Sequence, residues 1–308
     1  MPTPLLTGLV AAPFTPFLSD GRLNLELIPA LCDHLLAHRV SAAFVCGTTG
    51  EGTSLTDAER RQVTAAWVHA ARGRLKVVVH IGHLSASCAR ELAAHAQEVG
   101  ADAISSCAPS FFPIQSIEQL VSVTAESAAG APDLPFYFYH IPALTRMELS
   151  MVDYLHRAGP AIPSLRGVKF THADFEELLR LITYQNGHYE ILGGREQMLL
   201  AALATGARGA IGSNFNFAAP LYHEIWSSFQ NNDLPRARRL QGQAIELTLF
   251  FRRFGGLRAM KAVMAFLGLD CGPVRAPLKP LTLSEKKELE IGWQQLAQST
   301  PTLSMPTE

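Results

Sequence analysis

Lysine is scarce in this sequence, and one lysine is placed where it could form a covalent bond to a substrate. The 308 residues include six: Lys76, Lys169, Lys261, Lys279, Lys286 and Lys287. Only Lys169 lies inside a short apolar segment typical of a strand, near its C-terminal end. Burial favours the neutral amine, which is the form that attacks a carbonyl to give an imine. We therefore expect Lys169 to be a Schiff-base nucleophile, with a structural ion pair in the core as the alternative.

An aromatic segment, residues 136–140, ends in Tyr139 and His140. Side chains alternate between the two faces of a strand, so Tyr137 and Tyr139 share one face and His140 lies on the other. If the tyrosines point inward, Tyr139 lies one strand away from Lys169 at the same level. A phenol beside an imine can carry a proton to and from a substrate hydroxyl. We expect that role for Tyr139, whereas Tyr137 is explained well as a core aromatic.

Hydroxyl groups and glycines follow other apolar segments. Residues 47–54 read Gly-Thr-Thr-Gly-Glu-Gly-Thr-Ser, and the hydroxyls of Thr48 and Thr49 with nearby backbone N–H groups could hold a small carboxylate. The loop lacks the lysine of a nucleotide-binding P-loop. Residues 193–194 and 209–213 are also rich in glycine and allow a ligand to approach the backbone closely. Hydroxyl-rich loops are common, so this pattern supports a site only together with Lys169.

We expect no metal. His80 and His83 could be paired as metal ligands, but no carboxylate or cysteine stands at a matching spacing. The five cysteines are widely spaced, odd in number and without a C-x-x-C pair, which fits neither a disulfide framework nor a zinc cluster.

Short apolar segments alternate with amphipathic helical ones along the chain. The expected strands are 8–12, 42–46, 76–81, 103–107, 136–140, 167–170, 189–192 and 210–212. The expected helices between them are 25–38, 57–71, 85–99, 117–129, 150–157, 174–183 and 196–204. Thr56 and Glu59 have the spacing of a capping box, and Gly73, Gly100 and Gly206 mark helix ends.

This order predicts an α/β fold, a (β/α)₈ TIM barrel, with the active site at the C-terminal ends of the strands. An open doubly wound sheet is the alternative, but the first strand is not followed by its glycine-rich turn. After residue 212 only helices are expected, at 222–231, 234–254, 257–267 and 284–298. We therefore expect a barrel at 1–215, a helical extension at 216–298 packed on it as one structural unit, and a loose tail at 299–308.

Composition restricts the partners. The formal net charge is −1 and basic residues form no long run, so we expect neither nucleic acid nor a membrane as a partner. The first residues lack the features of a signal peptide, and no segment approaches the ~20 apolar residues of a membrane span. We expect a cytoplasmic protein acting on a small molecule.

Three motifs together resemble the signatures of the dihydrodipicolinate synthase / N-acetylneuraminate lyase superfamily. They are Gly-Thr-Thr-Gly-Glu at 47–51, Tyr-His-Ile-Pro-Ala-Leu-Thr at 139–145 and Gly-Val-Lys-Phe-Thr at 167–171, and the resemblance runs from about residue 5 to residue 296. It implies a pyruvate imine on Lys169, proton transfer by Tyr139, and Thr48 and Thr49 holding the pyruvate carboxylate within the proton relay. It also implies no cofactor and a homotetramer.

The residues around these motifs resemble the sialic acid lyase branch most. Dihydrodipicolinate synthases carry an arginine at the position of Leu144 and a tyrosine in the loop 109–113, which here has only phenylalanines as aromatic residues. The resemblance implies that Gly193, Glu196 and Ser213 bind the sugar portion, with Thr171 beside the imine.

One position departs from that branch. Arg195 stands where the lyases have an aspartate that accepts hydrogen bonds from the sugar, and a guanidinium has no acceptor. Arg146 likewise replaces a residue that is usually glycine. Arg195 would weaken binding of the usual sugar if it faces the substrate, or it would turn outward to pair with a surface carboxylate.

The function expected from this resemblance is cleavage of a 2-oxo sugar acid, N-acetylneuraminate, to N-acetylmannosamine and pyruvate. A sister aldolase or a dihydrodipicolinate-synthase-like enzyme acting on another 2-oxo acid is the first alternative. A non-catalytic, carboxylate-binding member is the second, and the presence of Lys169, Tyr139, Thr48 and Thr49 speaks against it.

Overall fold

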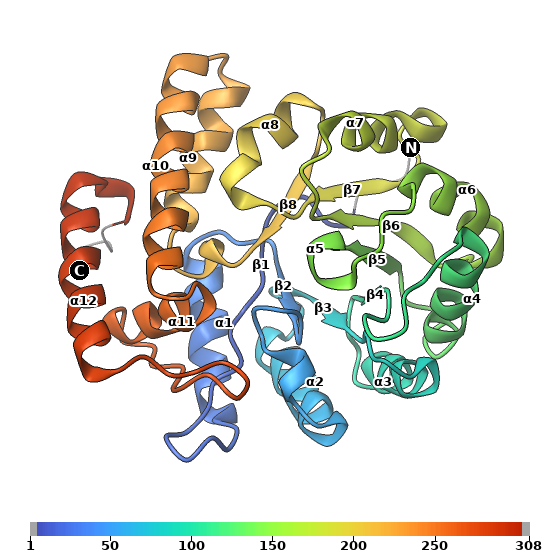
Figure 1. The fold of residues 1–308 in the computed structure, drawn as a ribbon, viewed down its shortest axis with the longest axis horizontal. Helices are drawn as coiled ribbons and strands as arrows, with labels where there is room; N and C mark the ends of the chain where they lie inside the picture. The colour runs from blue at the N-terminus through green and yellow to red at the C-terminus, as the bar shows by residue number, and fades with distance from the viewer. Residues whose placement is uncertain (1–4, 304–308) are drawn as a thin grey trace.

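Eight parallel strands form a closed barrel in the computed structural model, which describes residues 5–303 (Figure 1). Each strand pairs with the next, and β8 pairs with β1 to close the ring. The strands are β1 (Gly8–Ala11), β2 (Ala42–Val45), β3 (Lys76–His80), β4 (Ala103–Cys107), β5 (Phe136–His140), β6 (Leu165–Phe170), β7 (Glu190–Gly193) and β8 (Gly209–Gly212). The chain is therefore a (β/α)₈ TIM barrel, as predicted, and each observed strand end lies within two residues of its expected position.

Helices surround the barrel on its outer side (Figure 1). They are α1 (Ile28–Ala37), α2 (Asp57–Ala71), α3 (Ala86–Glu98), α4 (Ile117–Ala128), α6 (Met151–Ala161), α7 (Phe175–Thr183) and α8 (Leu199–Ala204), with a short α5 (Pro142–Thr145) after β5. The predicted capping box of α2 is present, with reciprocal hydrogen bonds between Thr56 and Glu59. Gly73, Gly100 and Gly206 have positive φ angles, as expected where helices end.

The barrel interior and the layer between strands and helices are two separate apolar clusters. The interior contains Tyr137 and Tyr139, together with Phe44 of β2. Phe136 and Phe138 of the same strand pack outward with the helices. The two tyrosines therefore share one face of β5, as predicted, and that face points into the barrel.

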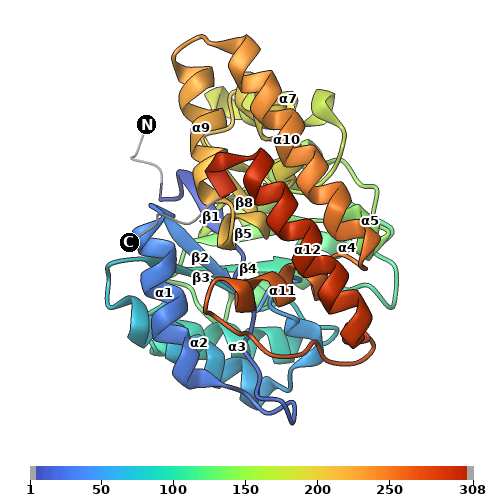
Figure 2. The same ribbon diagram turned by 90° about the vertical axis from the view of Figure 1, so that its left-hand side faces the viewer.

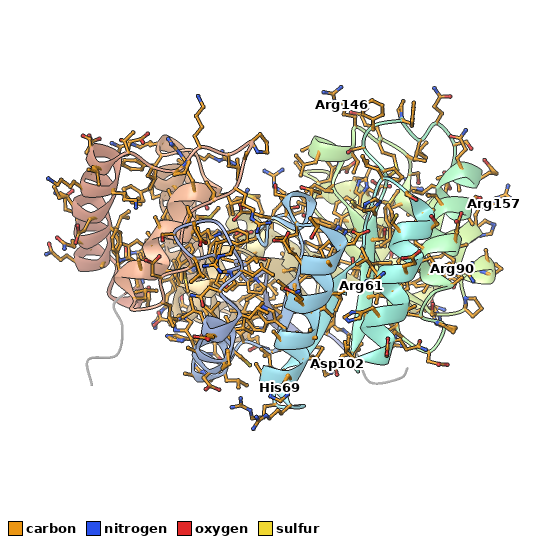
Figure 3. All side chains as sticks on the ribbon, turned by 90° about the horizontal axis from the view of Figure 1, so that it is seen from below. Arg61, His69, Arg90, Asp102, Arg146 and Arg157 are labelled. Carbon is orange, nitrogen blue, oxygen red and sulfur yellow. The ribbon has the colours of Figure 1, made fainter. Side chains whose placement is uncertain are left out.

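The N-terminal end of the barrel is closed by Glu190. Its carboxylate accepts hydrogen bonds from the backbone of Leu5 and Leu6 and from the Tyr137 hydroxyl, and it pairs with Arg166 at 2.6 Å. Figure 3 shows Asp102 and His69 at this end and Arg146 at the opposite one. The loops that follow the strands therefore lie at the end of the barrel marked by Arg146.

The C-terminal extension consists of α9 (Ala219–Gln230), α10 (Leu234–Arg253), α11 (Leu257–Phe266) and α12 (Leu283–Ser299). Figure 2 shows α10, α11 and α12 along one side of the barrel. Lys261 of α11 is buried and pairs at 2.7 Å with Glu51 from the loop after β2, which fastens the extension to the catalytic end. None of the helices within residues 5–303 is long and apolar enough to span a membrane.

Residues 301–303, part of the predicted loose tail at 299–308, have regular structure. Pro301–Leu303 forms a 3-10 turn, and Leu303 is buried against the core. Burial of the apolar Leu303 side chain stabilises this turn, and the polar sequence around it does not predict that burial. Residues 304–308 of the predicted tail lie outside the described part of the chain.

Candidate active site

Lys169 lies on β6 directly beside Tyr139 of β5, its partner in the strand register. The ammonium nitrogen Nζ is 3.8 Å from the centre of the Tyr139 ring and 4.2 Å from that of Phe44. Burial lowers the pKa of Lys169 from 10.5 to about 7, against an opposing effect of the carboxylate of Glu196. This lowered pKa makes the free amine, the state that imine formation requires, accessible near neutral pH.

Tyr139 is a buried phenol whose hydroxyl lies 3.5 Å from the hydroxyl of Thr48. Burial raises the pKa of Tyr139 to about 12, with an opposing effect of the Thr48 hydroxyl. The phenol is protonated near pH 7, so it can donate a proton at once. It can accept one only if a neighbouring cation lowers its pKa or its own proton moves on.

Thr49 follows β2 and Ser213 follows β8, the two strands that flank β1 in the barrel, and their hydroxyls form a hydrogen bond of 2.6 Å. The loop that carries Thr49 turns tightly at Gly52. Only glycine fits there, because a Cβ at this position would lie 1.9 Å from the carbonyl oxygen of Cys46. Glu51 in the same turn has a φ of 53° and is held by its ion pair with Lys261. The turn therefore fixes the two threonine hydroxyls at the end of the barrel where Lys169 lies.

Glu196 begins the short 3-10 turn after β7, and its carboxylate faces the β8 loop. One oxygen, Oε1, accepts hydrogen bonds from the backbone N–H groups of Ser213 at 3.0 Å and Asn214 at 3.1 Å. Burial nevertheless raises its pKa above 4.5. Gly212 leaves room for the carboxylate, since a Cβ there would lie 3.0 Å from it. The predicted grouping of Glu196 with Ser213 is thus seen in the structure.

Thr171 and Arg195 each have a buried polar atom with no hydrogen-bond partner within the described chain: Oγ1 of Thr171 and Nε of Arg195. Thr171 touches the backbone after β7 so closely that a Cβ on Gly194 would lie 1.8 Å from its hydroxyl oxygen. Arg195 forms no ion pair among residues 5–303, so the expected alternative of a surface carboxylate partner has no support there. Buried polar atoms without a partner are suited to a polar ligand.

His80 and Cys107 were not anticipated as neighbours of the site. The ring of His80 stands edge-on to Tyr139 at 5.7 Å, and its Nε2 lies 3.8 Å from the Cys107 sulfur. Burial and the charges of Arg60 and Lys169 hold the pKa of His80 well below 6.5, and burial raises that of Cys107 to about 11. Both groups are uncharged near pH 7 and keep the surroundings of Lys169 apolar. Both residues lie at the end of a strand on its inward face, and this position could have identified them from the sequence.

Gln241 of α10 is a second residue that local sequence did not single out. Its side chain accepts a hydrogen bond from the backbone of Leu200 at 2.8 Å and donates one to the carbonyl of Glu196 at 3.4 Å. The C-terminal extension thereby braces the turn that carries Glu196.

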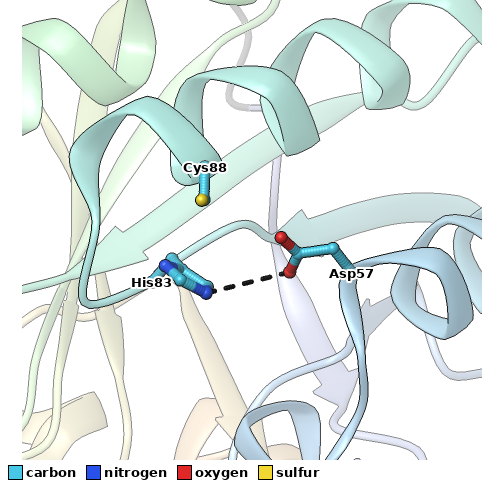
Figure 4. A group of neighbouring side chains, drawn as sticks. All are labelled: Asp57, His83 and Cys88. Atoms are coloured by element: carbon cyan, nitrogen blue, oxygen red, sulfur yellow. Dashed lines mark ion pairs between the residues drawn. The ribbon is translucent and has the colours of Figure 1, made fainter.

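His80 and His83 do not converge, because His80 points into the barrel and His83 lies between α2 and α3. There its Nε2 is 3.9 Å from a carboxylate oxygen of Asp57, near the sulfur of Cys88 (Figure 4). Of the two groups of three metal-ligating side chains among residues 5–303, this is one, and His140, His172 and Glu177 form the other. Neither includes Lys169 or Tyr139.

Comparison with known proteins agrees with this geometry. The sequence profile of the Dihydrodipicolinate synthetase family matches residues 5–296. N-acetylneuraminate lyase of Danio rerio is 39% identical over 92% of this chain and 94% of its own length, and that of Xenopus tropicalis is 42% identical over 89% and 90%. The solved structure of Proteus mirabilis N-acetylneuraminate lyase superimposes with a TM-score of 0.92 at 37% identity, covering 94% of this chain and 98% of the other. The chain therefore belongs to the dihydrodipicolinate synthetase family, in the branch of the N-acetylneuraminate lyases.

Proposed function

We propose that this chain is a Schiff-base aldolase that cleaves N-acetylneuraminate to N-acetylmannosamine and pyruvate. The observation that carries the proposal is the pair of Lys169 and Tyr139, with an amine of pKa about 7 held 3.8 Å above a protonated phenol. Proteins named N-acetylneuraminate lyase at 39% and 42% identity support the choice of substrate.

The reaction begins when the neutral amine of Lys169 attacks the 2-oxo carbon of the substrate. Loss of water gives an imine, and its protonated form is an electron sink next to the bond that breaks. The hydroxyl proton two carbons from the imine carbon is removed, the carbon–carbon bond breaks, and its electron pair passes into the enamine while the aldehyde leaves. Protonation of the enamine carbon and hydrolysis of the imine release pyruvate and restore Lys169.

Tyr139 moves the protons in this scheme. The positive charge of the protonated imine beside it lowers the pKa of the phenol and favours its role as acceptor of the substrate hydroxyl proton. The Thr48 hydroxyl at 3.5 Å is the nearest described group to which the phenol can pass its own proton. Thr48 and Thr49 hold the pyruvate carboxylate in this proposal.

The sugar portion lies against the loops after β6, β7 and β8. Thr171, Gly193, Glu196 and Ser213 supply its contacts in the proposal, and Arg195 adds a cation beside them. The free Oγ1 of Thr171 and Nε of Arg195 support this placement, because both atoms are buried without a partner among the described residues.

The proposed enzyme works as a homotetramer in the cytoplasm, with the barrel (1–215) and the extension (216–298) as one structural unit. The resemblance to the family implies the assembly, and the ion pair between Glu51 and Lys261 supports the joining of barrel and extension. Light scattering of the purified protein measures the assembly, and a monomer at micromolar concentration would contradict it.

A pyruvate-release assay with a panel of 2-oxo sugar acids tests the function. We expect N-acetylneuraminate to be cleaved with release of equimolar pyruvate. Condensation of pyruvate with an amino-acid aldehyde instead would favour the dihydrodipicolinate-synthase-like alternative. Carboxylate binding without turnover on any compound would favour the non-catalytic one.

A further inference from the structure

Three metal-ligating side chains meet on the outer side of the β5–β6 pair, behind the catalytic residues. His140 follows Tyr139 at the end of β5, His172 follows Thr171 after β6, and Glu177 lies in the first turn of α7. One ligand atom from each residue can be chosen so that all three lie within 4.8 Å of one another. A tetrahedral metal holds its ligands about 3–4 Å apart, so small side-chain rotations would complete the site.

His140 is prepared for a ligand that the protein itself does not supply. The residue is 1% exposed, and its Nδ1 is buried without a hydrogen-bond partner among residues 5–303. The ring stacks on Phe170 at 5.1 Å, which fixes its orientation. A buried imidazole nitrogen without a partner is uncommon and calls for an explanation.

Glu177 and its surroundings favour a cation. Its Oε1 accepts a hydrogen bond of 2.6 Å from the backbone of Met151, which leaves its other oxygen available. The three side chains line an open cleft of about 480 Å³. Three further carboxylates, Glu148, Asp174 and Glu176, line this cleft, against the single arginine Arg180.

The group in Figure 4 is less suited to a metal. The Nδ1 of His83 accepts a hydrogen bond of 2.9 Å from the backbone of Ser85, so the neutral ring carries its proton on Nε2, the nitrogen that faces Asp57. A metal would have to displace that proton or break the backbone hydrogen bond. The three residues Asp57, His83 and Cys88 are all partly exposed, so this group has no buried ligand comparable to His140.

We propose that His140, His172 and Glu177 form a binding site for a divalent transition metal of the zinc type, with a fourth position open to water or to a ligand in the cleft. Two imidazoles and one carboxylate are a set that zinc accepts with an open position. The site departs from the expectation of no metal. It is separate from the imine chemistry, since Lys169 and Tyr139 lie on the inner face of the same strands.

Calorimetric titration of the untagged, chelator-treated chain with Zn²⁺ tests the proposal. The starting protein is the Cys88→Ser, Asp57→Asn double variant, in which the group of Figure 4 is disabled. We expect one Zn²⁺ per chain, and the addition of either His172→Gln or Glu177→Gln should weaken binding at least ~100-fold, since loss of a direct ligand exceeds the 10–100-fold effect of an outer partner.

Both further substitutions are mild for the fold. His172 is exposed, and glutamine at 177 keeps an acceptor for the Met151 N–H. Circular dichroism and metal-free melting temperatures equal to those of the starting protein confirm intact folding. The proposal is overturned if the starting protein binds no Zn²⁺ saturably, or if its affinity is unchanged by His172→Gln and by Glu177→Gln. Pyruvate release by metal-free protein tests the proposed function separately, so failure of one proposal leaves the other distinguishable.

Discussion

Replacing Lys169 by methionine should stabilise the protein at pH 7 while abolishing its chemistry. The lysine is 5% exposed, and its pKa falls from 10.5 to about 7 on folding because burial disfavours the ammonium. One pKa unit corresponds to 1.36 kcal/mol. The buried Lys169 therefore lowers the free energy of unfolding at pH 7 by about 4–5 kcal/mol. Methionine has a similar length and no charge. Since it gives up the contacts of Nζ with the two rings, we expect a net gain of about 2–4 kcal/mol in the free energy of unfolding.

The pH dependence separates this explanation from better packing. Between pH 7 and 10.5 the unfolded chain holds the Lys169 proton and the folded chain does not, so native stability rises with pH across that window. The gain from Lys169→Met is therefore largest at and below pH 7 and disappears towards pH 10.5. Urea unfolding of both proteins at pH 7 and at pH 9.5, at one protein concentration, measures it. A variant less stable than the native protein at pH 7, or a difference that is equal at both pH values, would refute the reasoning.

Lys261 supplies the matched control. It is the second buried lysine, 1% exposed, but its Nζ pairs at 2.7 Å with Glu51. Lys261→Met leaves a buried carboxylate without its cation and should destabilise the protein by about 3–5 kcal/mol. The two lysine-to-methionine changes therefore act in opposite directions if the structure is read correctly.

Three further predictions concern catalysis. Tyr139→Phe should lower kcat by ~10²–10⁴ while imine formation persists, the usual size for a lost general acid–base group, and near-normal turnover would reduce Tyr139 to a packing role. The kcat/KM of the native enzyme should fall about tenfold per pH unit below about 7, as Lys169 becomes protonated, and a profile flat from pH 6 to 8 would contradict this. N-acetylneuraminate should be cleaved weakly, and Arg195→Asp should raise kcat/KM by about 5–100-fold, because a missing acceptor for a buried hydroxyl costs about 1–3 kcal/mol; equal values for both proteins would show that Arg195 does not determine specificity.

The features that depend on interactions between residues close in the sequence were predicted correctly. Strand and helix order followed from hydrophobic periodicity, and α2 was predicted over its full length because Thr56 and Glu59 cap it within one turn. The placement of Tyr137 and Tyr139 on one face followed from alternation along a strand, whereas the inward direction of that face was left open. By contrast, α6 continues to Ala161, past the predicted end at 157, because its last turn tolerates Pro160.

Contacts between distant segments could not be predicted in this way. The ion pair between Glu51 and Lys261 joins residues 210 positions apart. The sequence around either residue does not identify the other as its partner. Arg60 of α2 is buried and donates hydrogen bonds to the carbonyls of His80 and Gly82, and the sequence of α2 alone does not identify these acceptors. Such contacts form only when segments that are distant or separate in the sequence pack together in the folded chain.

Borohydride trapping tests the covalent mechanism most directly. Native protein incubated with pyruvate and reduced with borohydride should carry one three-carbon adduct per chain, and peptide mass mapping should place it on Lys169, the one lysine on a barrel strand beside Tyr139. Lys169→Met should carry none. An adduct on any other lysine, or no adduct on protein that still releases pyruvate, would contradict the assignment of Lys169 as the nucleophile.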